Sequence, residues 1–133
     1  MNEGALKGFE YFVLRFVPRV DREEFVNVGI VLYSQDFEFL DAACRVEEDR
    51  LRALAPGADL QDVKAALEAV ETICRGEAGA GPAAGMGPRQ RFDWLSAPRS
   101  TVVQPGPVHS GLTRNPAAEL QRLLGALVLE TPA

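Results

Sequence analysis

Residues 9–33 read FEYFVLRFVPRVDREEFVNVGIVLY, and this stretch decides the fold. In its first part, Phe12, Leu14 and Phe16 fall on one side of a period-two pattern, which is the repeat of a β-strand. Its second part also alternates between two sides, with Val26, Val28, Ile30 and Leu32 on one side and Phe25, Asn27, Gly29, Val31 and Tyr33 on the other. The stretch therefore predicts two β-strands joined by a short charged loop.

The loop at residues 18–24 closes an antiparallel hairpin in this interpretation. Its first residue, Pro18, ends the first strand because proline has no backbone N–H to donate. Counting back from the loop gives three predicted cross-strand pairs: Val17 with Phe25, Arg15 with Asn27, and Val13 with Gly29. One face of the hairpin is then fully apolar, and the other carries an arginine and an amide at its centre.

Length and composition are those of an ordinary globular domain. The 133 residues, 47% hydrophobic and 25% charged, predict a single domain covering residues 1–133. The formal net charge of −5 argues against DNA, RNA or an anionic membrane surface as an obligate partner. Charge is unevenly distributed, however: residues 89–114 hold four arginines and one aspartate. A local anion site in that region is compatible with the acidic total.

Cysteine usage and the amino terminus predict a cytoplasmic protein. Cys44 and Cys74 have no CxxC spacing, and buried free thiols are the favoured interpretation. No basic stretch followed by a long apolar run occurs at the amino terminus. The single histidine and the scattered carboxylates argue against a dedicated metal site, so we expect no metal and no cofactor.

Two further strands are predicted, at residues 37–46 and 100–104. Between them, residues 76–88 consist almost entirely of glycine, alanine and proline and predict a flexible loop within the domain. Trp94 is expected in the core of the protein. The segment His109-Ser110-Gly111 is rich in turn residues and is expected to be irregular.

Three helices are predicted from spacing and capping residues. Residues 47–55 form a short helix, and Asp59 caps a longer amphipathic helix that ends at Gly76. Asn115 and Pro116 occupy the N-cap and first positions of a final helix with a leucine-rich stripe.

These elements predict an α+β fold with an antiparallel sheet of about four strands. The predicted order is β-β-β-α-α-loop-β-α, with helices mainly on one face of the sheet. We expect the final helix and the helix after Asp59 to cover the same set of apolar side chains: Phe12, Leu14, Phe16, Val28 and Ile30.

The strongest candidate site combines the two polar residues of the hairpin with a second stretch, RQRFDWLSAPRSTVVQPGPVHSGLTRNP, at residues 89–116. Arginine binds phosphate or carboxylate through paired hydrogen bonds, hydroxyls add donors, and histidine exchanges a proton near neutral pH. His109 is the candidate general acid or base. The candidate anion ligands are Arg15, Asn27, Arg99, Ser100, Thr101 and His109. Two residues of the hairpin loop are candidates to reach over the sheet edge toward them: Arg22 and Glu24.

A purely structural role is the alternative for each of these residues. Arg15 can pair with Glu24, and Asn27 can hold the hairpin loop. Arg99 and Ser100 can bond to loop carbonyls beside the prolines. The charges of the hairpin loop can pair with one another.

Two strings of the chain carry a resemblance to a known family. RFVPRVDREEFVNVGIVLY, followed by RFDWLSAPRSTVVQPGPVHSGLT, resembles the bacterial family catalogued as domain of unknown function 3037. The matching parts are residues 10–33 and 91–124. The family has no established activity, so the resemblance implies no catalytic residue. It does imply a partner, because the genes of such proteins look like frequent neighbours of genes for kinases similar to HipA, the kinase of a toxin–antitoxin system.

Two hypotheses about function follow. The first is a non-catalytic binding or adaptor protein that partners a kinase similar to HipA, through its acidic helical face or an exposed sheet edge. The second is a small enzyme or binding protein for a phosphorylated compound, with Arg15 and Arg99 as anion clamps and His109 as general acid or base. A role with nucleic acid or at a membrane is disfavoured by the acidic charge and the absence of a long apolar run.

Overall fold

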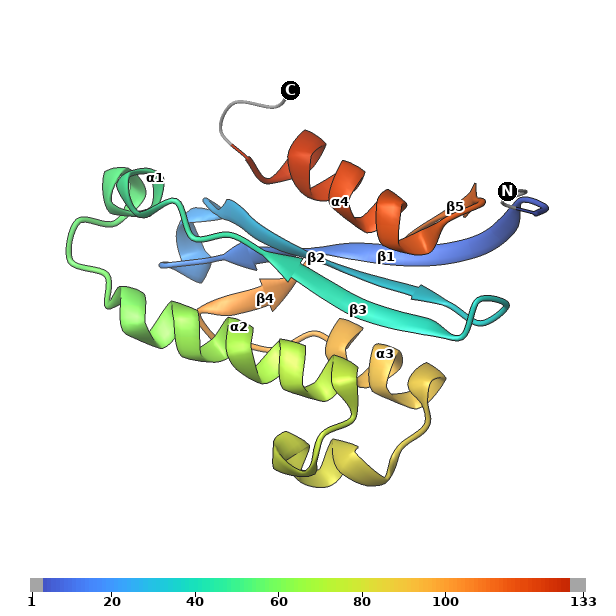
Figure 1. Ribbon diagram of the computed structural model, residues 1–133. Coiled ribbons are helices and arrows are strands. Elements are labelled where there is room, and N and C mark those ends of the chain that lie inside the picture. Colours follow the sequence, from blue (N-terminus) through green and yellow to red (C-terminus); the bar gives the residue numbers. More distant parts are fainter. Residues whose placement is uncertain (1–3, 130–133) are drawn as a thin grey trace.

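The structure is a computed structural model that describes residues 4–129 of the chain. It confirms the α+β class, with one antiparallel sheet (Figure 1). The sheet of the described part has five strands: β1 (Lys7–Phe16), β2 (Val26–Ser34), β3 (Phe39–Cys44), β4 (Val103–Pro105) and β5 (His109–Thr113).

The described residues also form four α-helices: α1 (Glu48–Leu54), α2 (Leu60–Arg75), α3 (Pro88–Ser96) and α4 (Pro116–Leu127). Short 3₁₀ segments occupy the hairpin loop, η1 (Val20–Arg22), and part of the Gly/Ala/Pro segment, η2 (Ala78–Gly85). The predicted caps are present: the Asp59 side chain accepts from the N–H of Gln61, and the Asn115 side chain accepts from that of Ala118. Gly76 ends α2 in the left-handed conformation, with φ of 68°.

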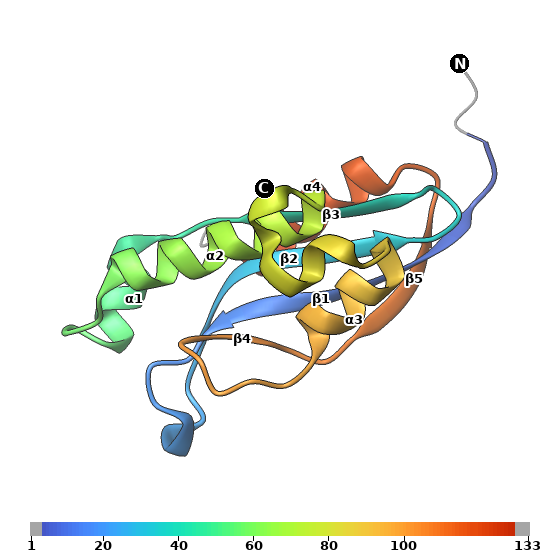
Figure 2. The same cartoon turned by 90° about the horizontal axis from the view of Figure 1, so that it is seen from below.

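Strand β1 is the centre of the sheet. It pairs with β2 along one side, and β2 pairs in turn with β3. Along its other side, β1 pairs with β4 near residue 15 and with β5 near residue 9 (Figure 2). The two stretches that carry the family resemblance therefore meet on one strand.

The β1–β2 register agrees with the prediction at one pair and differs at another. Arg15 lies opposite Asn27, as predicted, but Gly29 lies opposite Leu14 and not opposite Val13. Val28 is the extra residue of a β-bulge, which shifts the pairing by one position. Simple counting back from the loop was wrong beyond this point because counting assumes a regular ladder.

The bulge also changes which side chains of β2 share a face. Val28 packs in one core together with Val31 and Tyr33, whereas Ile30 and Leu32 pack in the other. The predicted grouping of Val28 with Ile30 is therefore wrong. A strictly alternating pattern cannot show the residue at which a bulge resets the alternation.

Two cores lie on opposite faces of the sheet. The larger core joins Phe12, Leu14 and Phe16 to residues of α1, α2 and α3. The smaller core joins Ile30 and Leu32 to the leucines of α4. Figure 1 shows α4 above the sheet and α2 with α3 below it. The expectation that the final helix covers Phe12 is therefore wrong, because both faces are apolar and α4 takes the second one.

The carboxyl-terminal half corrects three further expectations. The strand predicted at residues 100–104 begins only at Val103, and the segment predicted as irregular forms β5. Pro105 and Pro107 have no backbone N–H to donate. Both β4 and β5 nevertheless pair with β1, because an edge strand tolerates a missing donor. Trp94, expected in the core, is 41% exposed, and the neighbouring Phe92 and Leu95 are buried instead.

Of the two cysteines, Cys44 lies on β3 and Cys74 lies on α2. Both are free thiols; Cys74 is buried and Cys44 is partly buried. Burial, together with the negative charges of Asp41 and Glu71, raises the pKa of each thiol to about 12. Both thiols therefore stay protonated, and unreactive as nucleophiles, at neutral pH.

These thiols should make stability fall in alkaline solution. In the unfolded chain a thiol ionises near pH 8.5, whereas in the folded protein it holds its proton up to about pH 12. The folded state is thus penalised as the pH rises through this window, by up to about 1.4 kcal/mol per pH unit for each thiol. Urea unfolding at pH 8 and pH 10 measures this loss. The double variant Cys44→Ala, Cys74→Ala should lose less stability over the same interval, and an equal loss would contradict the prediction.

Candidate functional site

Arg15 lies at the centre of a polar row that crosses three strands. Asn27 on β2 and Gln104 on β4 are its direct cross-strand neighbours. Its guanidinium carbon lies 4.1 Å from the centroid of the Phe25 ring, and Gly106 lies so close to the guanidinium that a Cβ atom there would be 3.1 Å from it. This is a cation–π contact at a half-exposed position.

No ion pair neutralises Arg15 within the described residues. The Nε atom of Arg15 is buried and has no hydrogen-bond partner. The same holds for the Oδ1 atom of Asn27 on the neighbouring strand. The structural alternative in which Glu24 pairs with Arg15 is not what the structure shows. Glu24 instead accepts a hydrogen bond from Arg22 at 2.8 Å, which lowers the pKa of the Glu24 carboxyl.

Arg22 and Glu24 thus form a pair within the exposed hairpin loop. Arg19 and Asp21 form a second such pair in the same loop. The loop charges therefore neutralise one another, as one of the alternatives proposed. Exposed pairs of this kind contribute little to stability.

Asn27 holds the carboxyl-terminal end of α4. Its Nδ2 atom donates a hydrogen bond of 3.0 Å to the carbonyl oxygen of Leu127. Arg50 from α1 donates to the next carbonyl, that of Val128, at 2.8 Å. The last carbonyls of a helix have no partner within the helix, so these side chains satisfy groups that would otherwise be unpaired. Asn27 has this structural role whatever else it does.

Arg99 closes the end of α3. Its guanidinium donates to the carbonyl oxygens of Trp94 and Ala97, the second at 3.2 Å. Thr101 also bonds locally, to the carbonyl oxygen of Val103 at 2.7 Å. Ser100 is exposed beside them. Arg99 therefore closes the end of α3, and the hydrogen bonds of its guanidinium go to α3 and the residue after it.

His109 lies at the start of β5, opposite Tyr11 of β1. The centroids of the two rings are 5.3 Å apart and the ring planes are tilted by 34°. The His109 side chain is exposed. Arg15 is four residues further along β1, which corresponds to about 13 Å of extended strand. The structure thus brings Arg15 and Asn27 together, places His109 further along the same strand, and places Arg99 at the end of a helix. The proposed role of these residues in anion binding stays a prediction.

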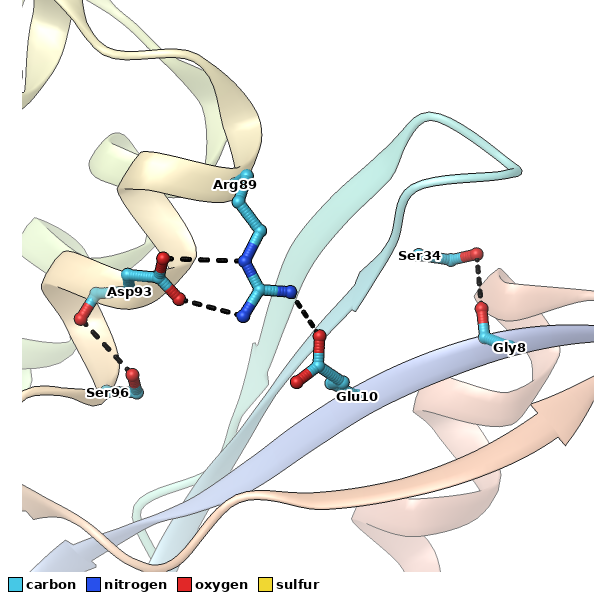
Figure 3. A network of polar contacts seen from close by, with 6 residues as sticks. All are labelled: Gly8, Glu10, Ser34, Arg89, Asp93 and Ser96. Carbon is cyan, nitrogen blue, oxygen red and sulfur yellow. Dashed lines mark hydrogen bonds and ion pairs between the residues drawn. The ribbon is translucent and has the colours of Figure 1, made fainter.

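A polar network that the sequence analysis did not identify joins α3 to β1 (Figure 3). Arg89 of α3 donates to Glu10 of β1 and, at 3.0 Å, to Asp93 one turn along its own helix. The same guanidinium lies over the rings of Tyr33 and Phe92. Only the spacing of Arg89 and Asp93 was visible in the sequence. Glu10 is distant in the chain, and no local pattern indicates that it pairs with Arg89.

A hollow of about 300 Å³ adjoins this network, beyond the start of α3. Glu10 and Arg89 line it on one side, and Ser110 with Gly111 of β5 line it on another. Arg89 is already paired with two carboxylates, and Asp36, which also lines the hollow, makes no ion pair within the part of the chain that the structure describes, so the uncompensated charge of the hollow is negative. It is better suited to an uncharged group than to a phosphate.

Residues 4–129 contain no metal-binding cluster and no membrane-spanning helix. Within this part of the chain, no three His, Cys, Asp or Glu side chains are grouped in a way that could hold a metal ion. No helix of the same part combines the length and the apolar character needed to span a bilayer.

Comparisons with known proteins identify a family. Neither the curated proteins nor the solved structures contain a significant match to this chain. The model of a family described as a protein of unknown function, DUF3037, matches residues 11–128. This match includes the middle of the chain, which the two resembling strings did not cover. The chain therefore belongs to the DUF3037 family of proteins of unknown function.

Proposed function

We propose that this protein is a non-catalytic protein-binding module, and that its partner is a kinase similar to HipA. The observation that carries the binding role is a pair of exposed apolar side chains at one edge of the sheet. Leu112 on β5 is 64% exposed, and Leu6, which lines a hollow together with Leu112, is 47% exposed. Exposed apolar side chains that gather in one place are typical of protein contact sites. The resemblance described above is what suggests the kinase.

The shape of this edge supports the same role. Leu6 and Leu112 line a shallow hollow of about 330 Å³ together with Arg114 and the first turn of α4. Gly8 of β1 is the direct cross-strand neighbour of Leu112, and a Cβ atom on Gly8 would meet nothing within 4 Å, so the sheet surface beside Leu112 is open. A partner side chain can therefore contact Leu112 on the face of the sheet that Gly8 and Leu112 share. Buried apolar anchors of this kind provide most of the affinity in many interfaces.

The proposal predicts that Leu112→Lys weakens binding of the kinase by about tenfold or more, because it replaces an apolar anchor with a charge. The measurement is calorimetric titration of the purified protein with a purified kinase similar to HipA from the same genome. The matched control is Val20→Lys, which changes a side chain that is 62% exposed in the hairpin loop, far along the chain from β5. The control should bind normally. If the unmodified protein does not bind the kinase, the proposed partner is wrong.

A further inference from the structure

The direction of the backbone groups along β1 shows which groups of β5 are left unpaired. The carbonyl of Gly8 points to β2, where it accepts a hydrogen bond from the Ser34 side chain at 2.8 Å. The carbonyl of Val13 points the other way, toward β4, and accepts from the N–H of Gly106 at 2.8 Å. Because the direction alternates along a strand, the odd-numbered residues of β1 face β5.

The pairing of β5 follows from this alternation. His109, Gly111 and Thr113 lie opposite odd-numbered residues of β1 and direct their backbone groups toward it. Ser110 and Leu112 therefore direct their N–H and C=O groups outward, away from the sheet. These outward groups make no hydrogen bond to any residue that the structure describes. The outer side of β5 is thus an open sheet edge.

The opposite edge of the sheet, on β3, is protected in a way that β5 is not. The N–H of Arg45 points inward, to the carbonyl of Val28, so the N–H of Ala42 points outward. The carboxylate of Asp41 accepts a hydrogen bond from this N–H at 2.8 Å. A side chain that occupies an outward donor, and brings a charge to the edge, discourages the addition of another strand.

The charges around β5 indicate the chemistry of a partner strand. Arg114, directly after β5, is exposed and makes no ion pair within residues 4–129. The ammonium of Lys7, opposite Thr113, lies over the ring of Phe37 and makes no ion pair with any described residue. The nearby carboxylates of Glu10 and Glu119 are already paired with arginines. Asp36, which lines a hollow with Ser110, makes no ion pair in the described part of the chain, so one uncompensated carboxylate stands against the two cations Lys7 and Arg114. The net field at this end of the edge is therefore positive, which favours acidic side chains in the partner.

We propose that the outer edge of β5 binds an extended, acidic segment of the partner chain as an added strand. The outward backbone groups of Ser110 and Leu112 supply the main-chain hydrogen bonds, and Leu112 contacts an apolar side chain of the segment. Lys7 and Arg114 attract its carboxylates. A second copy of this chain fits less well, because its net charge of −5 resides mainly outside β5 and it offers the same positive edge. This inference rests on the proposed function and specifies how the partner binds.

Amide hydrogen exchange of the ¹⁵N-labelled protein, alone and with saturating kinase, tests this mode of binding. In the free protein the Ser110 and Leu112 amides should exchange quickly. With kinase bound they should slow by about tenfold or more, whereas the inward amide of Gly111 should change little. Kinase that binds without protecting Ser110 and Leu112 would overturn the added strand and leave the proposed function intact. Failure of the kinase to bind would overturn both.

Two arginine variants and a sedimentation measurement complete the test. Arg114→Glu should weaken binding of the kinase by about tenfold, because it reverses the charge that attracts the acidic segment. Arg45→Glu is the matched control: it changes an exposed arginine beside the protected β3 edge and should leave affinity unchanged. Equal effects of the two variants would contradict an acidic segment. Sedimentation that shows a dimer, with Ser110 and Leu112 protected in the absence of kinase, would mean that a second copy occupies the edge.

Discussion

Gly29→Val is expected to lower the free energy of unfolding by about 3 kcal/mol, because the centre of the sheet has no room for a side chain at this position. A Cβ atom on Gly29 would lie 3.0 Å from the Sγ of Cys44 and from the Cδ1 of Leu14. It would also lie 3.1 Å from the carbonyl oxygen of Ala43, a backbone atom that cannot move independently. Gly29 follows the bulged residue of β2 and is paired with both β1 and β3. Removing these close contacts would therefore require both strands to change their pairing with β2. Urea unfolding followed by circular dichroism measures the change.

Gly8→Val is the matched control for this variant. Gly8 is also a strand glycine, but a Cβ atom there meets nothing within 4 Å. Valine should be tolerated at Gly8, within about 0.5 kcal/mol, since surface substitutions away from special features have small effects. Equal losses at the two positions would mean that general loss of glycine, and not the local contact, is responsible.

Phe12→Ala is expected to destabilise the protein by about 3–5 kcal/mol, the usual cost of emptying a buried aromatic site. Phe12 is fully buried at the centre of the larger core, and its ring lies 5.4 Å from that of Phe92 on α3. Removing it leaves a cavity between β1 and the helices that cover it. Because small domains are stable by only about 5–15 kcal/mol, this variant should unfold at a much lower urea concentration.

Phe25→Ala provides the comparison, because it removes the same ring from an exposed position. Phe25 is 44% exposed, and its ring makes a cation–π contact with the guanidinium of Arg15. Its loss should cost about 1 kcal/mol or less. A loss as large as that of Phe12→Ala would show that the Arg15 and Phe25 contact holds the hairpin more strongly than its exposure suggests.

The fold was predictable where the evidence for it is local. Alternation in residues 9–33 predicted β1 and β2, and the caps Asp59 and Asn115 predicted the starts of α2 and α4. A strand or a cap depends on residues a few positions apart, which a single sequence displays directly. The pair Arg15 and Asn27 was also predictable, because it lies between the loop and the bulge, where counting still holds.

The candidate site was predictable only in part, because it depends on which face and which edge each residue occupies. Arg99 was grouped with Arg15 on the basis of residue chemistry, yet it closes α3. The pair of Arg89 and Glu10 was not predicted, since its members are distant in the chain and belong to different elements. Hydrogen bonds of buried helix ends and long-range ion pairs are satisfied by whatever side chain the fold brings near.

By itself, the sequence determined the class of fold, the two central strands and the helix caps, since these follow from the periodicity and hydrogen-bonding capacity of neighbouring residues. Only the tertiary structure decided that α4 covers the second face, that a bulge at Val28 resets the register, and that β5 presents an open edge. These features depend on contacts between segments far apart in the chain. Local pattern cannot specify them, because both faces of the sheet are apolar and either one would bury a leucine-rich helix equally well.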